Sequence, residues 1–161
     1  MKTLIAYSSK YGAAAEVAEK LRGCIGGADA TDIKRNPGVS PAEYDAVVIG
    51  GPIYAGRIAG AVTAFCDRNK DALLARPVYL FITCLYAGEK AVAQLNECFP
   101  PWLVAHARAK TAVGGRITFG RLKFFDRMII KKVAGISADV DRIDHSAIDV
   151  LCAAITSGPT G

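Results

Sequence analysis

Residues 2–12 read KTLIAYSSKYG, an apolar strand that runs directly into a helix. The apolar run ends in two serines, a lysine, a tyrosine and a glycine, and helix-forming sequence follows at once. The first backbone N–H groups of a helix have no partner inside the helix, so after such a turn they point at one spot. The segment therefore predicts a site for one phosphate group.

Two familiar phosphate motifs do not fit this segment. The GxxxxGK[ST] loop needs Lys followed by Ser or Thr at the helix start, and the dinucleotide fingerprint needs GxGxxG. A loop in which Ser8, Ser9 and the amides of residues 10–14 surround one terminal phosphate, with Lys10 adding positive charge, fits better. An ordinary strand-to-helix turn with a hydroxyl cap has the same sequence, and this segment alone leaves that alternative open.

The composition is that of one domain covering residues 1–161. Of its residues, 52% are hydrophobic and 22% charged, and no apolar run reaches the roughly 18 residues of a membrane span. The first residues lack the pattern of a secretion signal, so we expect a cytoplasmic protein. The net charge of +5 favours an acidic partner, an anionic cofactor or an anionic membrane surface. No basic run is interleaved with aromatic residues, so no nucleic acid is expected, and the oligomeric state is not indicated.

The cysteines are scattered along the chain, at Cys24, Cys66, Cys84, Cys98 and Cys152. They form no CxxC or Cys/His pattern, so neither a disulfide framework nor a metal site is expected. We predict that most of them are small, buried apolar residues.

Strand-like and helix-like segments alternate along the chain. Strands are predicted at 4–7, 28–33, 46–49, 78–83 and 111–117, and helices at 14–21, 61–66, 90–95 and 147–155. This alternation is typical of right-handed βαβ units. It predicts an α/β fold with a doubly wound, five-stranded parallel sheet between two helical layers. Such sheets bind ligands at the carboxyl ends of the strands, beside the point where the strand order reverses.

Two more loops at that edge have chemistry that matches the first. Residues 50–57 read GGPIYAGR, and residues 83–88 read TCLYAG. Glycine lets a backbone approach a ligand closely, and tyrosine offers an aromatic face to a flat group. The three loops are therefore expected to converge on one ligand.

With these three segments in this order, the chain resembles the flavodoxin family. The resemblance rests on residues 6–12, 44–56 and 83–88, and it implies a flavodoxin-like fold that binds FMN. The phosphate would lie in the first loop and the ring between the other two, with Tyr54 and Tyr86 as aromatic contacts. The positions that match are Ser8, Ser9, Lys10, Tyr11, Gly12, Ala13 and Ala14 for the phosphate; Pro52, Ile53, Tyr54, Ala55 and Gly56 for one side of the ring; and Thr83, Cys84, Leu85, Tyr86 and Gly88 for the other.

Residues 125–131 (FDRMIIK) and 114–116 (GGR) are similar to the flavodoxin-type, menaquinone-dependent protoporphyrinogen oxidases. This similarity implies an FMN-dependent oxidoreductase that acts on a porphyrinogen or passes electrons to a quinone or another redox partner. A small FMN electron carrier without enzymatic activity and a flavin-free interaction domain remain the alternatives. No residue is indicated as catalytic, because a bound flavin itself carries the redox chemistry.

Ala14 departs from the family pattern, which usually has Thr or Ser at this position. A hydrogen bond to a charged group contributes about 1.5–3 kcal/mol, which corresponds to about ten- to a hundredfold in affinity. The missing hydroxyl implies weaker FMN binding, and it keeps open the alternative of a chain that has lost FMN.

Residues 116–132 combine basic and large apolar side chains. The composition suits a helix that lies on the inner face of an anionic membrane as a peripheral contact, or that meets a hydrophobic electron partner. It also suits a helix that packs its apolar face on the sheet and leaves its lysines in water. The sequence does not decide between the two.

Overall fold

The computed structural model describes residues 1–158 and has a central sheet with the strand order β2-β1-β3-β5-β6. These strands are β1 (Thr3–Tyr7), β2 (Ala28–Asp32), β3 (Ala46–Tyr54), β5 (Val78–Thr83) and β6 (Ala109–Ala112). Neighbouring strands in this order are parallel. A short β4 (Arg57–Ile58) turns back antiparallel onto β3. The flavodoxin-like α/β sheet predicted from the sequence is confirmed.

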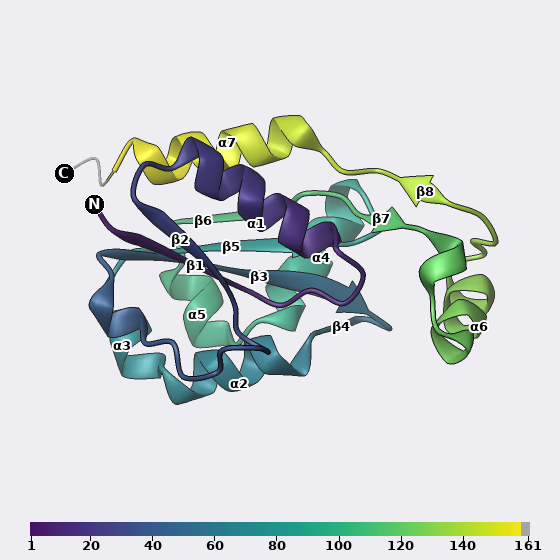
Figure 1. Cartoon of the computed structure of the whole chain (residues 1–161), viewed down its shortest axis with the longest axis horizontal. Coiled ribbons are helices and arrows are strands. Elements are labelled where there is room, and N and C mark those ends of the chain that lie inside the picture. The colour runs from purple at the N-terminus through teal and green to yellow at the C-terminus, as the bar shows by residue number, and fades with distance from the viewer. Residues whose placement is uncertain (159–161) are drawn as a thin grey trace.

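Helices cover both faces of the sheet (Figure 1). One face carries α1 (Ala13–Cys24) and α7 (His145–Thr156). The other carries α2 (Gly60–Arg68), α3 (Lys70–Leu74), α4 (Gly88–Cys98) and α5 (Pro101–His106), and a single 3₁₀ turn at Pro41–Glu43 precedes β3.

Burial on both faces explains why these strands are apolar throughout. Successive residues of β1 point to opposite faces of the sheet. Leu4 and Ala6 pack in the cluster under α2 and α4, while Ile5 packs under α1 and α7. Every residue of β5 is buried. Continuous apolar strands of this kind are typical of parallel sheets with helices on both sides.

The predicted strand at 111–117 is wrong in its second half. The strand β6 ends at Ala112, and Arg116–Ile117 form a separate strand, β7, that pairs antiparallel with β8 (Val140–Asp141). The cause is a chain crossing at Gly114, which has φ 72°, and where a Cβ would collide with the carbonyl oxygen of Arg142. Only glycine fits this crossing.

Residues 116–141 form an excursion beyond the carboxyl ends of the strands. Between β7 and β8 it contains a 3₁₀ turn at Phe119–Arg121 and α6 (Phe124–Val133). Figure 1 shows α6 at the right-hand end of the molecule, apart from the helices that cover the sheet. Within residues 1–158, no helix is both long enough and apolar enough to cross a bilayer.

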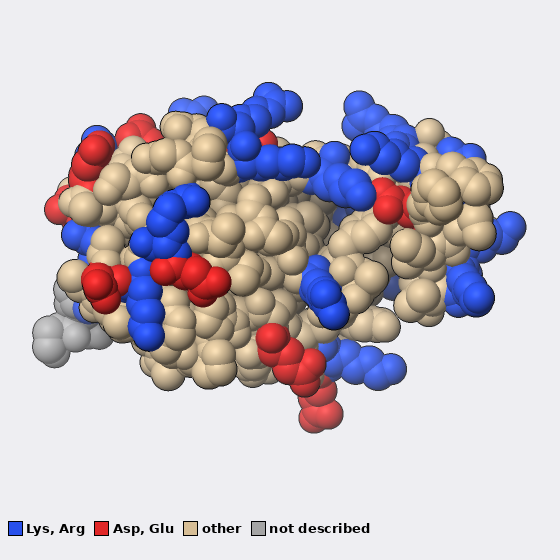
Figure 2. All heavy atoms as spheres, turned by 90° about the horizontal axis from the view of Figure 1, so that it is seen from below, with Lys and Arg blue, Asp and Glu red and all other residues tan. Residues whose placement is uncertain are grey.

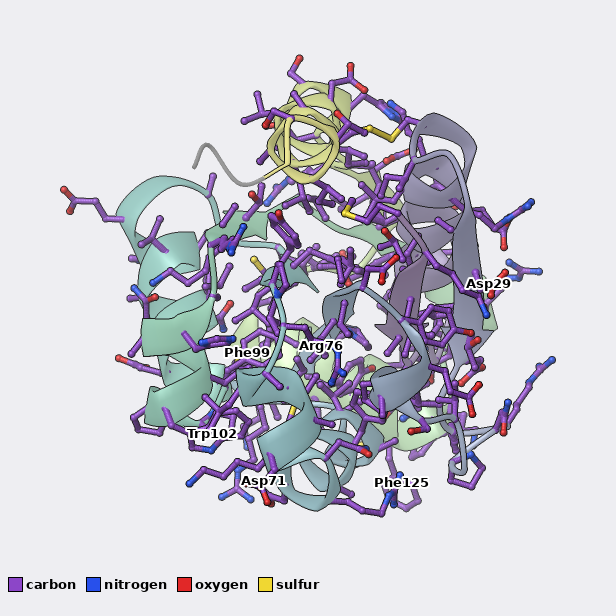
Figure 3. All side chains as sticks on the ribbon, turned by 90° about the vertical axis from the view of Figure 1, so that its left-hand side faces the viewer. Asp29, Asp71, Arg76, Phe99, Trp102 and Phe125 are labelled. Atoms are coloured by element: carbon purple, nitrogen blue, oxygen red, sulfur yellow. A yellow bond between two sulfur atoms is a disulfide. The ribbon has the colours of Figure 1, made fainter. Side chains whose placement is uncertain are left out.

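The expectation that the chain has no disulfide is wrong. Cys24 at the end of α1 and Cys152 in α7 are bonded, with their Cα atoms 6.5 Å apart, and Figure 3 shows a disulfide between these two helices. Their separation of 128 residues hides the pair in the sequence, because only the packing of α1 beside α7 brings them together. Cys66 and Cys84 are buried, as predicted for most of the cysteines, and Cys98 is partly buried.

The disulfide is expected to stabilise the fold by restricting the unfolded chain, by about 2–4 kcal/mol. The protein unfolded without reductant should have three reactive thiols, from Cys66, Cys84 and Cys98. Reductant should lower the melting temperature of the native protein and of a Cys98→Ser control, and leave that of a Cys24→Ser/Cys152→Ser variant unchanged. Five reactive thiols without reductant would contradict the pairing.

Candidate functional site

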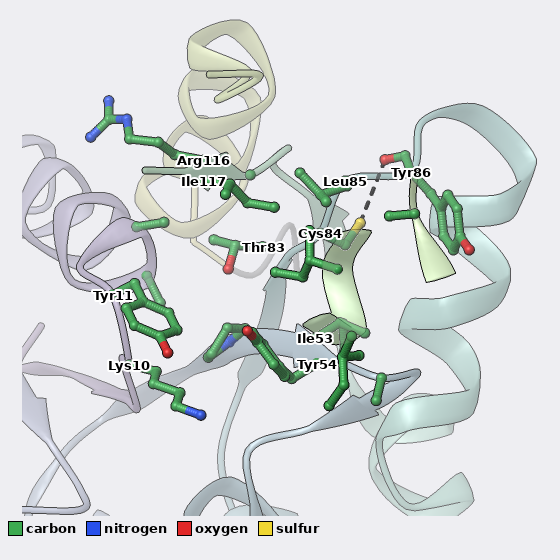
Figure 4. A pocket seen from close by; sticks show the side chains of 18 of the residues that line it. Lys10, Tyr11, Ile53, Tyr54, Thr83, Cys84, Leu85, Tyr86, Arg116 and Ile117 are labelled. Carbon is green, nitrogen blue, oxygen red and sulfur yellow. Dashed lines mark hydrogen bonds between the residues drawn. The ribbon is translucent and has the colours of Figure 1, made fainter. Parts of the chain in front are cut away.

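The three predicted loops meet in one cavity at the carboxyl ends of β1, β3 and β5 (Figure 4). It encloses about 960 Å³ of space, part of which is open to solvent. The predicted residues that line it are Ser9, Lys10, Tyr11, Ala13, Ala14, Pro52, Ile53, Tyr54, Ala55, Gly56, Thr83, Cys84, Leu85 and Tyr86. Ser8 lines an adjoining hollow with Ser9 and Lys10. Gly12 and Gly88 do not line the cavity; they start helices α1 and α4.

The first loop leaves the N-terminus of α1 without a side-chain cap. Gly12 is the N-cap residue with φ 98°, a conformation that suits glycine, and its own N–H donates to Ser9 Oγ at 3.1 Å. Because Gly12 has no side chain, it cannot accept hydrogen bonds from the N–H groups of the helical residues that follow it. Uncapped amides at the positive end of a 12-residue helix are the groups that a phosphate requires.

Ala14 lies where the first turn of α1 meets both the core and the cavity. It is 1% exposed and packs with Val17 and Leu21 in the layer under α1. It also contributes to the cavity wall. The position that usually supplies a hydroxyl to the phosphate therefore offers only a methyl group here.

The second loop is a tight hairpin that presents Tyr54. Ala55 has φ 49° and Gly56 has φ 76°, the two positive values of a type I′ turn, and Tyr54 pairs with Arg57 across it. A positive φ is unfavourable for alanine, and strain of this kind often occurs at ligand sites. The hydroxyl oxygen of Tyr54 is buried without a hydrogen-bond partner. Burial, and then the negative charge of Asp126, raise the pKa of Tyr54, so the phenol stays protonated.

The third loop provides the opposite wall. Thr83 is 4% exposed and lines the cavity, which gives this wall one polar group. Burial raises the pKa of the Cys84 thiol, and its Sγ donates to the carbonyl oxygen of Tyr86 at 3.5 Å. Tyr86 is 44% exposed, and its ring lies across the cavity from Tyr54, turned toward α4 (Figure 4). The two tyrosines do not face each other in the structure.

The fourth wall comes from the excursion, whose residues were not among those predicted for the site. Ile129, Ile130 and Val133 of α6 line the cavity, together with Ile117 and Leu122. The composition of residues 116–132 left open a membrane-facing helix and a helix packed on the sheet, and nothing in the sequence indicates which loop such a helix would approach. The excursion makes the cavity deeper and more apolar than three loops alone would.

An ionic contact joins α6 to the first loop. Asp126 is 8% exposed, and its Oδ2 lies 2.6 Å from Lys10 Nζ and also accepts a hydrogen bond from the Tyr11 hydroxyl. Burial alone would raise the pKa of Asp126, but the bonds from Lys10 and Tyr11 and the charges of Lys10 and Lys123 outweigh burial, so its pKa is lowered. Asp126 is therefore ionised at neutral pH.

A second ionic contact holds the base of the excursion. The Arg116 guanidinium binds Glu16 in the first turn of α1, with Nη2 to Oε1 at 3.2 Å, and Asp141 in β8 at 3.1 Å. Arg116 thereby fixes the β7–β8 hairpin against α1.

The sequence matches the model of the flavodoxin domain over residues 4–144. This chain belongs to the flavodoxin domain family. FMN is the cofactor of that family, and the uncapped helix, the apolar cavity and the buried polar groups of Tyr54 and Thr83 fit it. Among curated proteins, no sequence matches this chain.

Solved structures agree with this fold. The Trp repressor binding protein of Bacillus subtilis has 12% identity and a TM-score of 0.59, over 99% of this chain and 100% of that one. An NADH:FMN oxidoreductase in its apo form has 16% identity and a TM-score of 0.54, over 99% and 93%. Oxidised flavodoxin 1 of Bacillus cereus has 12% identity and a TM-score of 0.51, over 97% and 98%. At these identities the likeness concerns the fold alone.

The chain spans about a third of the length of one larger protein of similar structure. It aligns over 96% of its own length with 37% of the rubredoxin oxygen:oxidoreductase of Desulfovibrio gigas, at 15% identity and a TM-score of 0.49.

The Ala14→Ser variant should bind FMN more tightly than the native protein, because it restores a hydroxyl at the phosphate loop. A hydrogen bond to a charged phosphate predicts an affinity about ten- to a hundredfold higher, measured by quenching of FMN fluorescence. Ala15→Ser adds a hydroxyl one residue further along and outside the cavity wall, and it should leave the affinity unchanged. Equal effects of both variants would contradict the assignment of Ala14 to the phosphate site.

Proposed function

We propose that this protein is an FMN-dependent oxidoreductase that works at the surface of an anionic membrane. The observation that carries the proposal is the cavity, in which an uncapped helix N-terminus lies beside apolar and aromatic walls. The isoalloxazine ring supplies the redox chemistry when FMN is bound. All other roles belong to the residues around it.

The residues of the cavity divide between the two ends of the cofactor. Ser9, Lys10 and the amides of residues 11, 13 and 14 would hold the phosphate. Tyr54 and the loop at 83–86 would flank the ring. Ile129 and Ile130 would give the ring apolar neighbours on the side of the cavity toward α6.

The surface of α6 supports a membrane contact. Phe124, Phe125 and Met128, which we call the exposed α6 face, are between 53% and 76% exposed, whereas the buried residues of α6 are Asp126 and Ile130. The alternative of a helix that packs its apolar face on the sheet does not agree with these exposures. Large exposed apolar side chains in one patch indicate an interaction site.

The charge around this face favours anionic lipid over another apolar surface. Basic side chains surround it, and Figure 2 shows Lys and Arg gathered at this end of the molecule, around a surface of other residues. The exposed basic residues of this segment are Arg121, Lys123, Lys131 and Lys132. A basic helix with aromatic and aliphatic residues on its outer face is suited to the headgroup region of the cytoplasmic leaflet, where each cation contributes about 1 kcal/mol.

The reaction follows from this location and from the sequence similarity at residues 114–116 and 125–131. We propose that in each cycle a porphyrinogen gives up two hydrogen atoms at the flavin site, and that a quinone dissolved in the membrane takes up both and becomes a quinol. The apolar wall of α6 lies between the cavity and the exposed α6 face, so an apolar acceptor would have a short path from the bilayer.

Anaerobic turnover of a porphyrinogen tests this proposal. Protein loaded with FMN should form porphyrin with a water-soluble quinone, and also with a long-chain quinone carried in anionic vesicles. The Phe124→Ser/Phe125→Ser variant should retain turnover with the soluble quinone and lose most of it with the vesicle-borne one. A Val92→Ser/Val150→Ser control removes apolar side chains that are 57% and 67% exposed on α4 and α7, and it should behave like the native protein.

Two outcomes would contradict the proposal. Protein that binds FMN and accepts electrons from a chemical reductant, but turns over no porphyrinogen, would be an electron carrier. Equal use of the vesicle-borne quinone by the Phe124→Ser/Phe125→Ser variant and the Val92→Ser/Val150→Ser control would exclude the membrane contact through α6.

A further inference from the structure

The Asp126 carboxylate binds the Lys10 ammonium, whose positive charge the phosphate of FMN would need. Lys10 belongs to the phosphate loop, and its ammonium is bound to the Asp126 carboxylate at 2.6 Å. The next residue of the loop, Tyr11, donates its hydroxyl to the same carboxylate, and the backbone N–H of Lys123 donates to that hydroxyl at 3.2 Å. Two consecutive residues of the phosphate loop are thus held by one acidic side chain of α6.

The position of Lys10 makes it the centre of this contact. Its Nζ lies 4.8 Å from the centre of the Tyr54 ring and 5.5 Å from that of Tyr11, and the residue lines both the cavity and the adjoining hollow next to Ser8 and Ser9. A phosphate ester carries close to two negative charges at neutral pH, whereas a carboxylate carries one. When both anions lie beside one ammonium, they repel each other, and the more highly charged phosphate gains more from the ammonium.

The helix α6 has few other attachments to the rest of the molecule. Besides Asp126 its buried residue is Ile130, which belongs to a small cluster with Ile117 and Leu122. This cluster is separate from the two core clusters of the sheet, and Tyr11, Tyr54 and Leu85 pack against it. The contacts of Arg116 with Glu16 and Asp141 hold the hairpin at the base of the excursion and do not involve α6. Loss of the Asp126 contact would therefore loosen α6 and leave the excursion attached.

We propose that Asp126 competes with the FMN phosphate for Lys10, so that flavin binding and the docking of α6 to an anionic membrane are coupled. In the flavin-free protein, Asp126 holds α6 on the phosphate loop. Phosphate in the loop weakens that hold and frees α6 for lipid. This inference rests on the proposed function, because it requires both the flavin site and the membrane contact.

The coupling is reciprocal. If FMN favours the loosened α6, lipid that binds the loosened α6 must increase the affinity for FMN by the same factor. Couplings between two sites in a protein typically span about five- to 150-fold. The contact of Asp126 with Lys10 is partly exposed, since the Lys10 side chain is 42% exposed, so a value at the low end is expected.

A comparison of FMN with riboflavin, which lacks the phosphate, tests the competition. The Asp126→Asn variant keeps the size of the side chain and removes its charge. It should bind FMN about five- to tenfold more tightly than the native protein, and riboflavin with unchanged affinity, in fluorescence titrations at low salt. Asp126→Glu keeps the charge and should retain the native FMN affinity. Asp71→Asn removes a carboxylate from α3, at the opposite end of the molecule (Figures 1 and 3), and should have no effect.

Vesicles provide the second measurement. Anionic vesicles should tighten the binding of FMN to the native protein by a similar factor, vesicles of neutral lipid should not, and the Asp126→Asn variant should no longer respond. Weaker FMN binding by Asp126→Asn, an equal change for riboflavin, or a vesicle effect that survives this substitution would each overturn the competition. Native protein that binds neither flavin would overturn the proposed function itself.

Discussion

The geometry of the molecule depends on the reversal of strand order beside β1. The chain leaves β1 for α1 and β2 on one side, and then returns to β3 on the other side of β1. The loops after β1 and β3 consequently diverge at the carboxyl edge, and no connection fills the space between them. The uncapped N-terminus of α1 opens into that space. The parallel sheet thus places the positive end of a helix and two glycine-containing loops around one cavity before any ligand is present.

The excursion at residues 116–141 changes what this edge can do. It adds an apolar wall to the cavity through Ile129 and Ile130, and it places the exposed α6 face outside the same wall. A single helix therefore borders the cofactor site on one side and solvent on the other. Because Asp126 ties this helix to Lys10, the charge of the phosphate loop and the position of the outer surface are not independent.

The fold and the three loops could be predicted because they depend on local patterns. Continuous apolar runs such as residues 78–83 mark strands that are buried on both faces, and the serines and glycine after β1 mark the helix start. The disulfide, the β7–β8 hairpin and the role of Asp126 depend on contacts between distant segments. Asp126 lies 115 residues from Tyr11, and no periodicity in the chain indicates that the two meet. The glycine at position 114 was a sign that a strand could end there, but the apolar residues on both sides of it led to the prediction of one continuous strand at 111–117.

Mapping FMN onto the backbone amides by NMR tests the central claim most directly. Titration of the isotope-labelled protein with FMN should shift amides in the loops at 9–14, 52–56 and 83–88 in a saturable way, together with those of α6, and leave β2 and α3 unchanged. Riboflavin should reproduce the shifts of the second and third loops and spare the first. An absence of saturable shifts, or shifts centred away from the carboxyl edge of the sheet, would contradict the account.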